Sequence, residues 1–246
     1  MIILYDNEIL NSTNTTNSEN SDYPLSNLQD TRAAKFFRTL TDSAVRIVFN
    51  KTSLNADWFF ILNHNITSGA TIKLEANATD SWGSPSLSET ITWNADTMFL
   101  DFTEATYNYW SLYVDDSSNP DAFIQIGLCV LGKALVMPGQ TTNPTIRYID
   151  TSQKTRSTSG QSYKDIRYNY RTISSVFPII TQSEFDDIET MIRFHWNNGP
   201  VMMYMWEESP GSQSPMYCDI NQTIEQKKLD QSGIAYTINL DFEEVF

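Results

Sequence analysis

Short segments in which apolar and polar residues alternate dominate the first half of the chain. In 109–116, every second residue from Trp110 to Val114 is apolar, which is typical of a half-buried strand. The segment 122–132 is apolar almost throughout, as expected of a strand covered on both faces. Between them, the turn-forming residues 119–121 (Asn-Pro-Asp) predict that the two strands form a hairpin.

Other segments of the first half also carry strand patterns, and no helical period of apolar residues occurs there. Close, regular spacing of short strands with turn-rich connections indicates a β-sandwich. The further predicted strands are 44–49, 58–62, 71–76, 89–93 and 97–102.

The second half mixes strands with one helix. Apolar residues recur at helical spacing on one face of 183–196, with Ser183 as the predicted N-cap and Asp186 three residues later. The run 197–200 (Asn-Asn-Gly-Pro) ends that helix. Strand patterns occupy 168–177, 201–206, 216–220 and 234–242.

These patterns predict a mainly β chain in which a β-sandwich precedes a β domain with one packed helix. The segment between them is rich in Ser, Thr, Gln and Gly and is predicted to be an extended linker. The predicted divisions are an N-terminal strand and polar arm at 1–22, the sandwich at 23–137, the linker at 138–162 and the second domain at 163–246.

Charge excludes one class of function. Sixteen basic against thirty acidic residues give a net charge of −14, whereas binding to nucleic acid requires a basic face. No apolar run approaches the roughly 18 residues that span a bilayer, and residues 1–6 lack the basic start of a signal peptide. We therefore expect synthesis in a reducing cytoplasm, no membrane partner, and buried free thiols at Cys129 and Cys218.

The order of several short motifs resembles the distal-tail and minor-tail proteins of long-tailed bacteriophages. The predicted hairpin that ends at Gly127 looks like the closing strands of a galactose-binding-like (discoidin-type) jelly roll, and the 183–196 helix before Gly199-Pro200 looks like the tail-tube-derived fold of tail-tip rings. The remaining motifs of this resemblance are Tyr23–Leu28 with Arg32, Phe36 and Arg38, the segment 57–76, Tyr163, Arg171 and the terminal strand ending 242–245.

This resemblance implies a structural virion protein without enzymatic activity. It implies a homo-oligomeric ring, hexameric in such tails, that joins the tail tube protein to hub, tip or fibre proteins. DNA would pass through the ring without specific binding, and acidic residues of the second half would repel it. The candidate acids are Asp165, Glu207, Glu208, Asp219 and Glu225.

Catalytic chemistry finds little support in the sequence. His64 and His195 are the two histidines, and neither belongs to a recognisable catalytic or zinc-binding motif. The oxygen-bearing residues at 115–121 raise the alternative of a calcium site, although Asn-Pro-Asp forms a turn in its own right. Adjacent acids at 186–187, 207–208 and 243–244 leave glycoside hydrolysis as a more distant alternative. We predict no cofactor and no metal.

Carbohydrate binding is the main alternative to a tail protein. Sugar sites on jelly rolls are loop sites with an exposed aromatic ring, and Trp82 lies in the polar loop 80–85. The same tryptophan could instead anchor its loop on the core or contact a neighbouring subunit. Trp82 is thus the candidate carbohydrate-binding residue of a module that recognises host-surface glycans.

Overall fold

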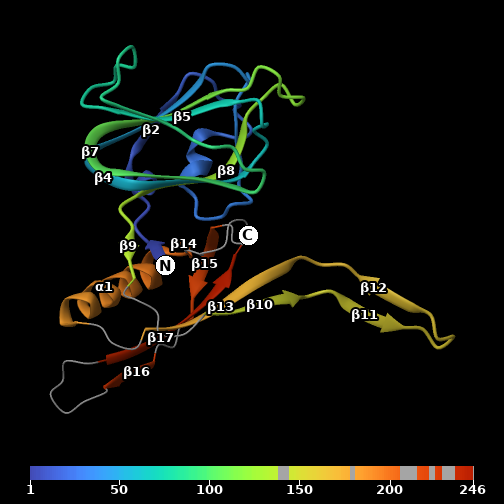
Figure 1. The fold of residues 1–246 in the computed structure, drawn as a ribbon. Helices are drawn as coiled ribbons and strands as arrows, with labels where there is room; N and C mark the ends of the chain where they lie inside the picture. The colour runs from blue at the N-terminus through green and yellow to red at the C-terminus, as the bar shows by residue number, and fades with distance from the viewer. Residues whose placement is uncertain (138–143, 178–180, 206–214, 222–224, 229–235, 246) are drawn as a thin grey trace. The chain divides into compact units, whose positions relative to one another are not determined.

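The computed structural model describes residues 1–137, 144–177, 181–205, 215–221, 225–228 and 236–245. The chain forms two compact units (Figure 1). The first, called the sandwich unit below, contains residues 2–135 and 202–215. The second, called the helix unit, contains Met1, 136–201 and 216–245. Among the described residues, no helix combines the length and apolar content needed to cross a bilayer.

The sandwich unit is built around two long antiparallel strands, β4 and β7, that curve together (Figure 1). The strands of its sheet follow the order β3-β8-β4-β7-β5-β6, with β2 also beside β4. Their bounds are β2 Thr13–Thr16, β3 Phe37–Arg38, β4 Val45–His64, β5 Thr71–Asn77, β6 Leu87–Thr90, β7 Thr97–Asp115 and β8 Gln125–Gly132.

Each long strand contributes to both layers of the sandwich. The first part of β4 pairs with the last part of β7, next to β2 and β5, whereas the last part of β4 pairs with the first part of β7, next to β8. Two register shifts, between Asn50 and Leu54 and between Ala56 and Trp58, interrupt the pairing at the bend. Such irregularities bend a strand and increase its twist, so segments predicted as separate strands are continuous.

The core lies between the two layers. Alternate residues of the long strands point inward, including Phe49, Phe59 and Trp110, which are fully buried. Phe60 is also fully buried, but on the opposite side of β4, where it stacks with Trp58 and Phe99. This explains why 58–62 is apolar at every position.

The predicted hairpin between 109–116 and 122–132 is wrong. β7 and β8 are both neighbours of β4 in the sheet order, so β4 lies between them. Residues 116–124 therefore connect one layer to the other rather than two paired strands. The turn itself is present, because Asn119 N–H donates to the Asp116 carbonyl and Ala122 N–H to the Asn119 carbonyl.

The N-terminal residues add to the sandwich unit. β2 pairs with β4 inside the range predicted as a polar arm, because its Thr and Asn side chains tolerate a half-exposed edge position. β1 (Ile2–Leu4) pairs with β14 (Val201–Tyr204). Tyr204 packs on Trp58 and Phe99, with ring centroids 5.8 and 4.8 Å apart.

The helix unit contains an antiparallel sheet whose strands pair in the order β10-β13-β17-β15. Apolar residues on one face form a cross-strand row in which Ile173, Phe242 and Ile220 are buried. The bounds are β10 Thr145–Asp150, β13 Asn169–Phe177, β15 Met216–Ile220 and β17 Tyr236–Glu244, with β16 (Glu225–Lys228) also paired to β17. The short β9 (Leu135–Val136) neighbours β1 in the sheet order.

Three strands lie in or begin within the predicted linker 138–162, namely β10 and two further strands. β11 (Gln153–Arg156) and β12 (Ser162–Asp165) form a separate two-stranded hairpin that continues from β10 and β13 (Figure 1). We call residues 150–168 the arm. Its strand residues Gln153, Thr155 and Ser162 pair through the backbone and remain exposed, so a polar composition like that of a linker is compatible with a hairpin.

The helix α1 (Gln182–Asn198), which is the only α-helix among the described residues, begins one residue before the predicted start. Thr181, rather than Ser183, is the N-cap, and its side chain and that of Glu184 form a reciprocal capping box. The helix ends at Asn198, within the run 197–200 that was predicted to end it, and Gly199 follows with a φ of 101°. The fold class is confirmed as mainly β, with a sandwich followed by a β domain that carries one helix.

Candidate functional site

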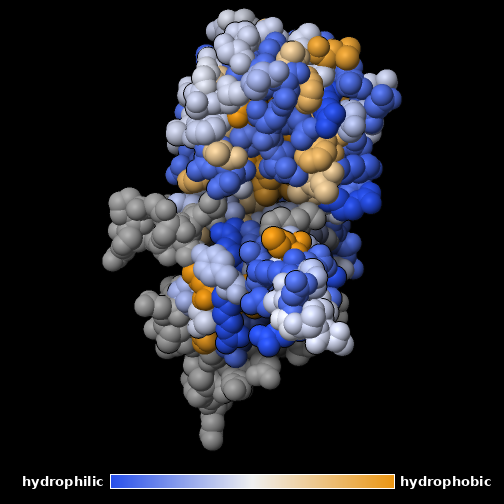
Figure 2. Space-filling model, turned by 90° about the vertical axis from the view of Figure 1, so that its right-hand side faces the viewer, coloured by the Kyte–Doolittle hydropathy of each residue, from blue (hydrophilic) through white to orange (hydrophobic). Residues whose placement is uncertain are grey.

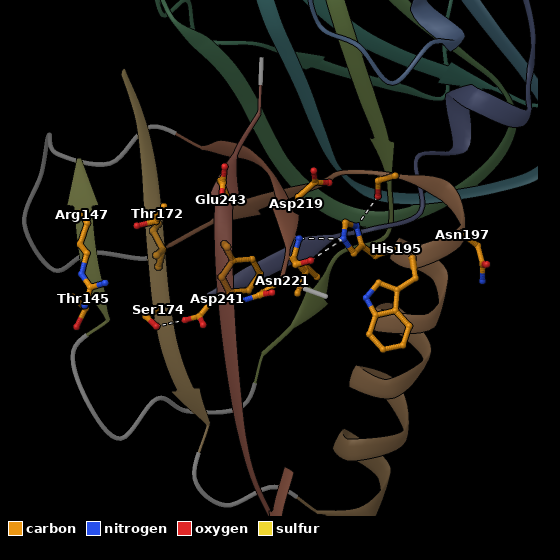
Figure 3. Close-up of a pocket in the computed structure, with 15 residues that line it drawn as sticks. Thr145, Arg147, Thr172, Ser174, His195, Asn197, Asp219, Asn221, Asp241 and Glu243 are labelled. Atoms are coloured by element: carbon orange, nitrogen blue, oxygen red, sulfur yellow. Dashed lines mark hydrogen bonds between the residues drawn. The ribbon is translucent and has the colours of Figure 1, made fainter. Parts of the chain in front are cut away.

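Two rows of polar side chains cover one face of the helix-unit sheet (Figure 3). The register aligns Arg147 with Thr172, Thr172 with Glu243, and Glu243 with Asp219. A second row aligns Thr145, Ser174 and Asp241, and the Ser174 hydroxyl donates to the Asp241 carboxylate. Because successive residues of a strand point to opposite faces, both rows lie opposite the apolar row.

These rows form the floor of a hollow of about 730 Å³. The end of α1 supplies another part of its lining, with His195, Trp196 and Asn197 (Figure 3). Trp196 is 53% exposed, although it is one of the largest apolar side chains of the unit. The hollow therefore combines a polar floor with an accessible aromatic ring, a combination found in binding sites.

The charge of the hollow is negative. Asp219, Asp241 and Glu243 oppose a single cation, Arg147. Asp219 and Glu243 face each other directly across β15 and β17, and neither has an ion-pair partner among the residues that the structure describes. Like charges directly opposite each other destabilise a sheet, so this pair favours a cation in the hollow.

His195 is a structural side chain at the edge of the hollow. Its Nδ1 lies 2.7 Å from the Gly199 carbonyl oxygen, and its Nε2 accepts the N–H of Ile220 at 3.1 Å. These two bonds assign the proton to Nδ1 and join the end of α1 to β15. Both nitrogens are thus occupied by backbone groups.

The adjacent acids at 243–244 lie on opposite faces of β17. Glu243 lies in the hollow, whereas Glu244 points to the other face and binds the Arg171 guanidinium at 2.5 Å. Asp186 accepts from the side chain of Gln182 near the start of α1. The pair at 207–208 lies outside the described residues, as do the side-chain surroundings of residue 225.

The predicted carbohydrate-binding residue, Trp82, lies over the outer face of the other unit's sandwich. Its indole N–H donates to Asp80 at 2.7 Å, and the Arg46 guanidinium lies 4.8 Å from its ring centroid. The same guanidinium lies 5.1 Å from the ring of Tyr113. Trp82 is partly exposed and is separate from the hollow.

Two buried groups hold the Arg46 guanidinium in place. It binds the Glu75 carboxylate at 2.5 Å and the Ser111 hydroxyl at 2.8 Å. Glu75 is 6% exposed and Ser111 fully buried, so the guanidinium has little freedom. Since cation–π attraction strengthens when water is displaced, this arrangement holds the Trp82 ring in one orientation.

His64 lies at the end of β4 and also contacts the backbone through both nitrogens. Nδ1 accepts the N–H of Ile66 at 3.2 Å, and Nε2 lies 3.1 Å from the Asn94 carbonyl oxygen. Burial lowers the pKa of His64. Neither histidine is thus bonded to a nucleophilic side chain, which agrees with the structural interpretation of both.

Residues 115–121, for which a calcium site was the alternative, include a hydrogen-bonded turn. Asp116 is 2% exposed, and its carboxylate accepts from the Thr67 N–H and hydroxyl and from the Asn119 amide. Asp121 accepts from the Asn65 amide at 2.9 Å. Protein donors therefore occupy both carboxylate oxygens of Asp116 and one of Asp121.

Both cysteines are free and buried, as predicted. Burial raises the pKa of the Cys129 thiol and of the Cys218 thiol well above their ordinary range. Reactive cysteines are partly exposed thiolates. These two side chains are core residues.

The hollow was not predicted from the sequence, because its lining comes from four strands and a helix whose pairing is not encoded locally. One signal was available. In β17, the residues Asp241 and Glu243 alternate with Leu240 and Phe242, so one face of a buried-looking strand is acidic. A strand that is acidic on one face and apolar on the other has an exposed acidic surface. The sequence does not tell which strands lie beside it.

Comparison with protein-family models gives no match, and curated protein sequences give none either. Solved structures similar to about half of this chain include carbohydrate-binding modules. Chitosan-binding module 1 of a chitosanase/glucanase from Paenibacillus sp. IK-5 has 18% identity and a TM-score of 0.41, covering 52% of this chain and 98% of that one.

Two other neighbours are similar in extent. A His 62 mutant of the lectin binding domain of lectinolysin, in complex with Lewis b, has 8% identity and a TM-score of 0.45, covering 53% of this chain and 98% of that one. A Streptococcus pneumoniae fucose-binding module has 9% identity and a TM-score of 0.43, covering 52% of this chain and 95% of that one.

Proposed function

We propose that this chain is a non-catalytic glycan-binding protein whose β-sandwich holds a saccharide against Trp82. The observation that carries this proposal is the ordered stack of Trp82, Arg46 and Tyr113 on the outer face of the sandwich. An aromatic ring that is already fixed loses little conformational freedom when a ligand packs on it. Arg46 occupies one face of the indole, and the partly exposed remainder is available to the apolar face of a sugar ring.

Polar groups beside the ring suit a hydroxyl-rich ligand. Asp80 is exposed next to the indole, and Lys73 lies opposite Tyr113 across β5 and β7. The face of the molecule that Figure 2 shows is mostly hydrophilic, with scattered apolar residues. With a net charge of −14 on the chain, we expect neutral or cationic saccharides to bind better than acidic ones.

Replacement of Trp82 tests the proposal. Trp82→Ala should weaken binding to a responsive oligosaccharide at least tenfold, a loss of about 1.4 kcal/mol, because the stacking surface is removed. Trp82→Phe should retain part of the affinity. Binding is measured by glycan array followed by titration calorimetry on the full chain.

Trp196→Ala is the matched control, because it removes an exposed tryptophan from the other unit. It should leave glycan affinity unchanged. Circular dichroism checks that each variant is folded. The proposal is overturned if the chain binds no member of a broad panel of neutral and cationic oligosaccharides, or if Trp82→Ala binds as well as the natural chain.

A second candidate is the ring-forming structural protein of a phage tail that the sequence motifs suggest. The observation that favours it is the arm, a hairpin that exposes large side chains without a covering partner among the described residues. Tyr163 is 58% exposed and Ile166 80% exposed. Aromatic and large apolar residues are enriched where protein surfaces meet, so the arm suits contact with another protein chain.

A further inference from the structure

The arm is basic, in contrast to the chain as a whole. Residues 150–168 contain four cations, Lys154, Arg156, Lys164 and Arg167, against Asp150 and Asp165, which gives four minus two, or +2. Lys164 pairs with Asp150 at 2.9 Å and Arg167 with Asp165 at 3.0 Å. Lys154 and Arg156 have no ion-pair partner among the described residues.

These two free cations lie at neighbouring positions on the same face of β11. All residues of β11 and β12 are exposed, and the two strands pair with each other alone. An isolated two-stranded hairpin is marginally stable in water, and its open edges readily meet another chain. The arm thus has both the charge and the lack of cover expected of an interaction element.

The hollow has complementary properties. Asp219 and Glu243 repel each other and have no cationic partner among the described residues, while Trp196 offers a ring surface for a guanidinium. A volume of about 730 Å³ accepts a few side chains from the tip of a hairpin, not a whole domain.

We infer that the arm of one copy inserts Lys154 and Arg156 into the acidic hollow of a second copy. The occupant cannot be the same copy's arm, because Arg147 lines the hollow and β10 leads from it toward the arm. The nine residues from Arg147 to Arg156 span roughly 30 Å in extended conformation. The cations are therefore carried away from their own hollow.

This contact is head-to-tail, since two different surfaces meet. Repetition of such a contact closes a ring if the rotation allows it, and otherwise forms an open filament. The inference names the contact that the ring-forming candidate requires and rests on that candidate. It does not depend on glycan binding by the sandwich.

Charge exchange on the full chain tests the contact. The double variant Lys154→Glu/Arg156→Glu and the double variant Asp219→Lys/Glu243→Lys should each weaken self-association at least tenfold. Combining all four substitutions should restore it, because the complementary charges return in exchanged positions. Association is measured by sedimentation velocity and light scattering, and that of the natural chain should fall as salt rises.

Two controls separate this contact from other effects. Glu89→Lys/Asp101→Lys is the control for the hollow reversal, because it also replaces two acids by lysines, but on exposed residues of the sandwich. It should leave association unchanged. If the charge-reversed hollow fails to fold, the milder double variant Asp219→Asn/Glu243→Gln takes its place. It removes both negative charges and should also weaken association.

The inference is overturned by a natural chain that stays monomeric at low salt and high concentration, or by reversals that associate normally. It is also overturned if folded fourfold variants do not regain association. An oligomer that persists in both reversals would retain the ring-forming candidate while excluding this contact. Electron microscopy of that oligomer distinguishes a closed ring from a filament.

Discussion

At the scale of single residues, the chemically suggestive side chains are mostly explained by packing. The sequence identified both histidines as structural, and the geometry agrees because each ring contacts two backbone groups. Trp82 was recognisable because a tryptophan in a polar loop is unusual. Its partner Arg46 was not, because the two lie 36 positions apart and meet only through the pairing of β4, β5 and β7.

His64 should make the stability of the chain dependent on pH. Burial lowers its pKa, so the unfolded chain, with a histidine pKa near 6.5, binds a proton more readily than the folded chain. The stabilisation is therefore complete above about pH 6.5 and is lost as the pH falls toward the folded pKa. Urea unfolding across this range should show a steeper loss for the natural chain than for His64→Gln.

The natural chain and His64→Gln share all other titrating groups. The difference between their unfolding free energies therefore isolates the contribution of His64. Burial also raises the pKa of Asp6 and that of Asp57, and their contribution has the opposite sign because it stabilises the chain as the pH falls. Asp96, which favours protonated His64, is present in both chains. A difference in unfolding free energy that stays constant with pH would contradict the prediction.

At the scale of elements, the alternating pattern located most strands but not their partners. The pattern found 44–49 and 58–62, yet the bend that joins them contains polar residues that resemble a loop. The error over the hairpin has the same origin, since neighbouring strands in sequence usually pair, and here β4 separates them. The helix was better determined, because its period, cap and glycine stop are local features.

Strand β8 shows how closely the sandwich elements approach. A Cβ atom on Gly127 would collide with the backbone carbonyl of Ala33 and lie 2.9 Å from the Cβ of Asn63. Gly127→Ala should therefore lower the free energy of unfolding by about 1–3 kcal/mol, the usual cost of overpacking. Gly83→Ala is the matched control, because nothing lies within 4 Å of its Cβ position.

Thermal and urea unfolding of both glycine variants measure the difference. Gly83 lies in an exposed loop, so the added methyl group should change stability little. Equal stabilities of the two variants would mean that the backbone near Ala33 moves away without cost. In that case the close approach of β8 would not contribute to the rigidity of the sandwich.

At the scale of the whole molecule, the chain passes between its two units more than once. Residues 202–205 belong to the sandwich unit, although they follow β10, β13 and α1 in the chain. β1 pairs with β14 in this returning segment, and Tyr204 covers Trp58 and Phe99. The sandwich is thus completed by residues that follow it by more than 60 positions, which no local pattern reveals.

This arrangement predicts that residues 1–137 alone form an incomplete sandwich. Without 202–204, the fully buried Ile3 of β1 loses its partner Met203 in β14, so that only β9 remains beside β1, and Trp58 loses an aromatic neighbour. The fragment should unfold at a lower temperature than the sandwich in the full chain and should bind a hydrophobic dye. Tyr204→Ala in the full chain should shift the same transition in the same direction but less far, because β1 keeps its backbone partner. A fragment as stable as the full-chain sandwich would show instead that the returning strand covers the aromatic surface without stabilising it.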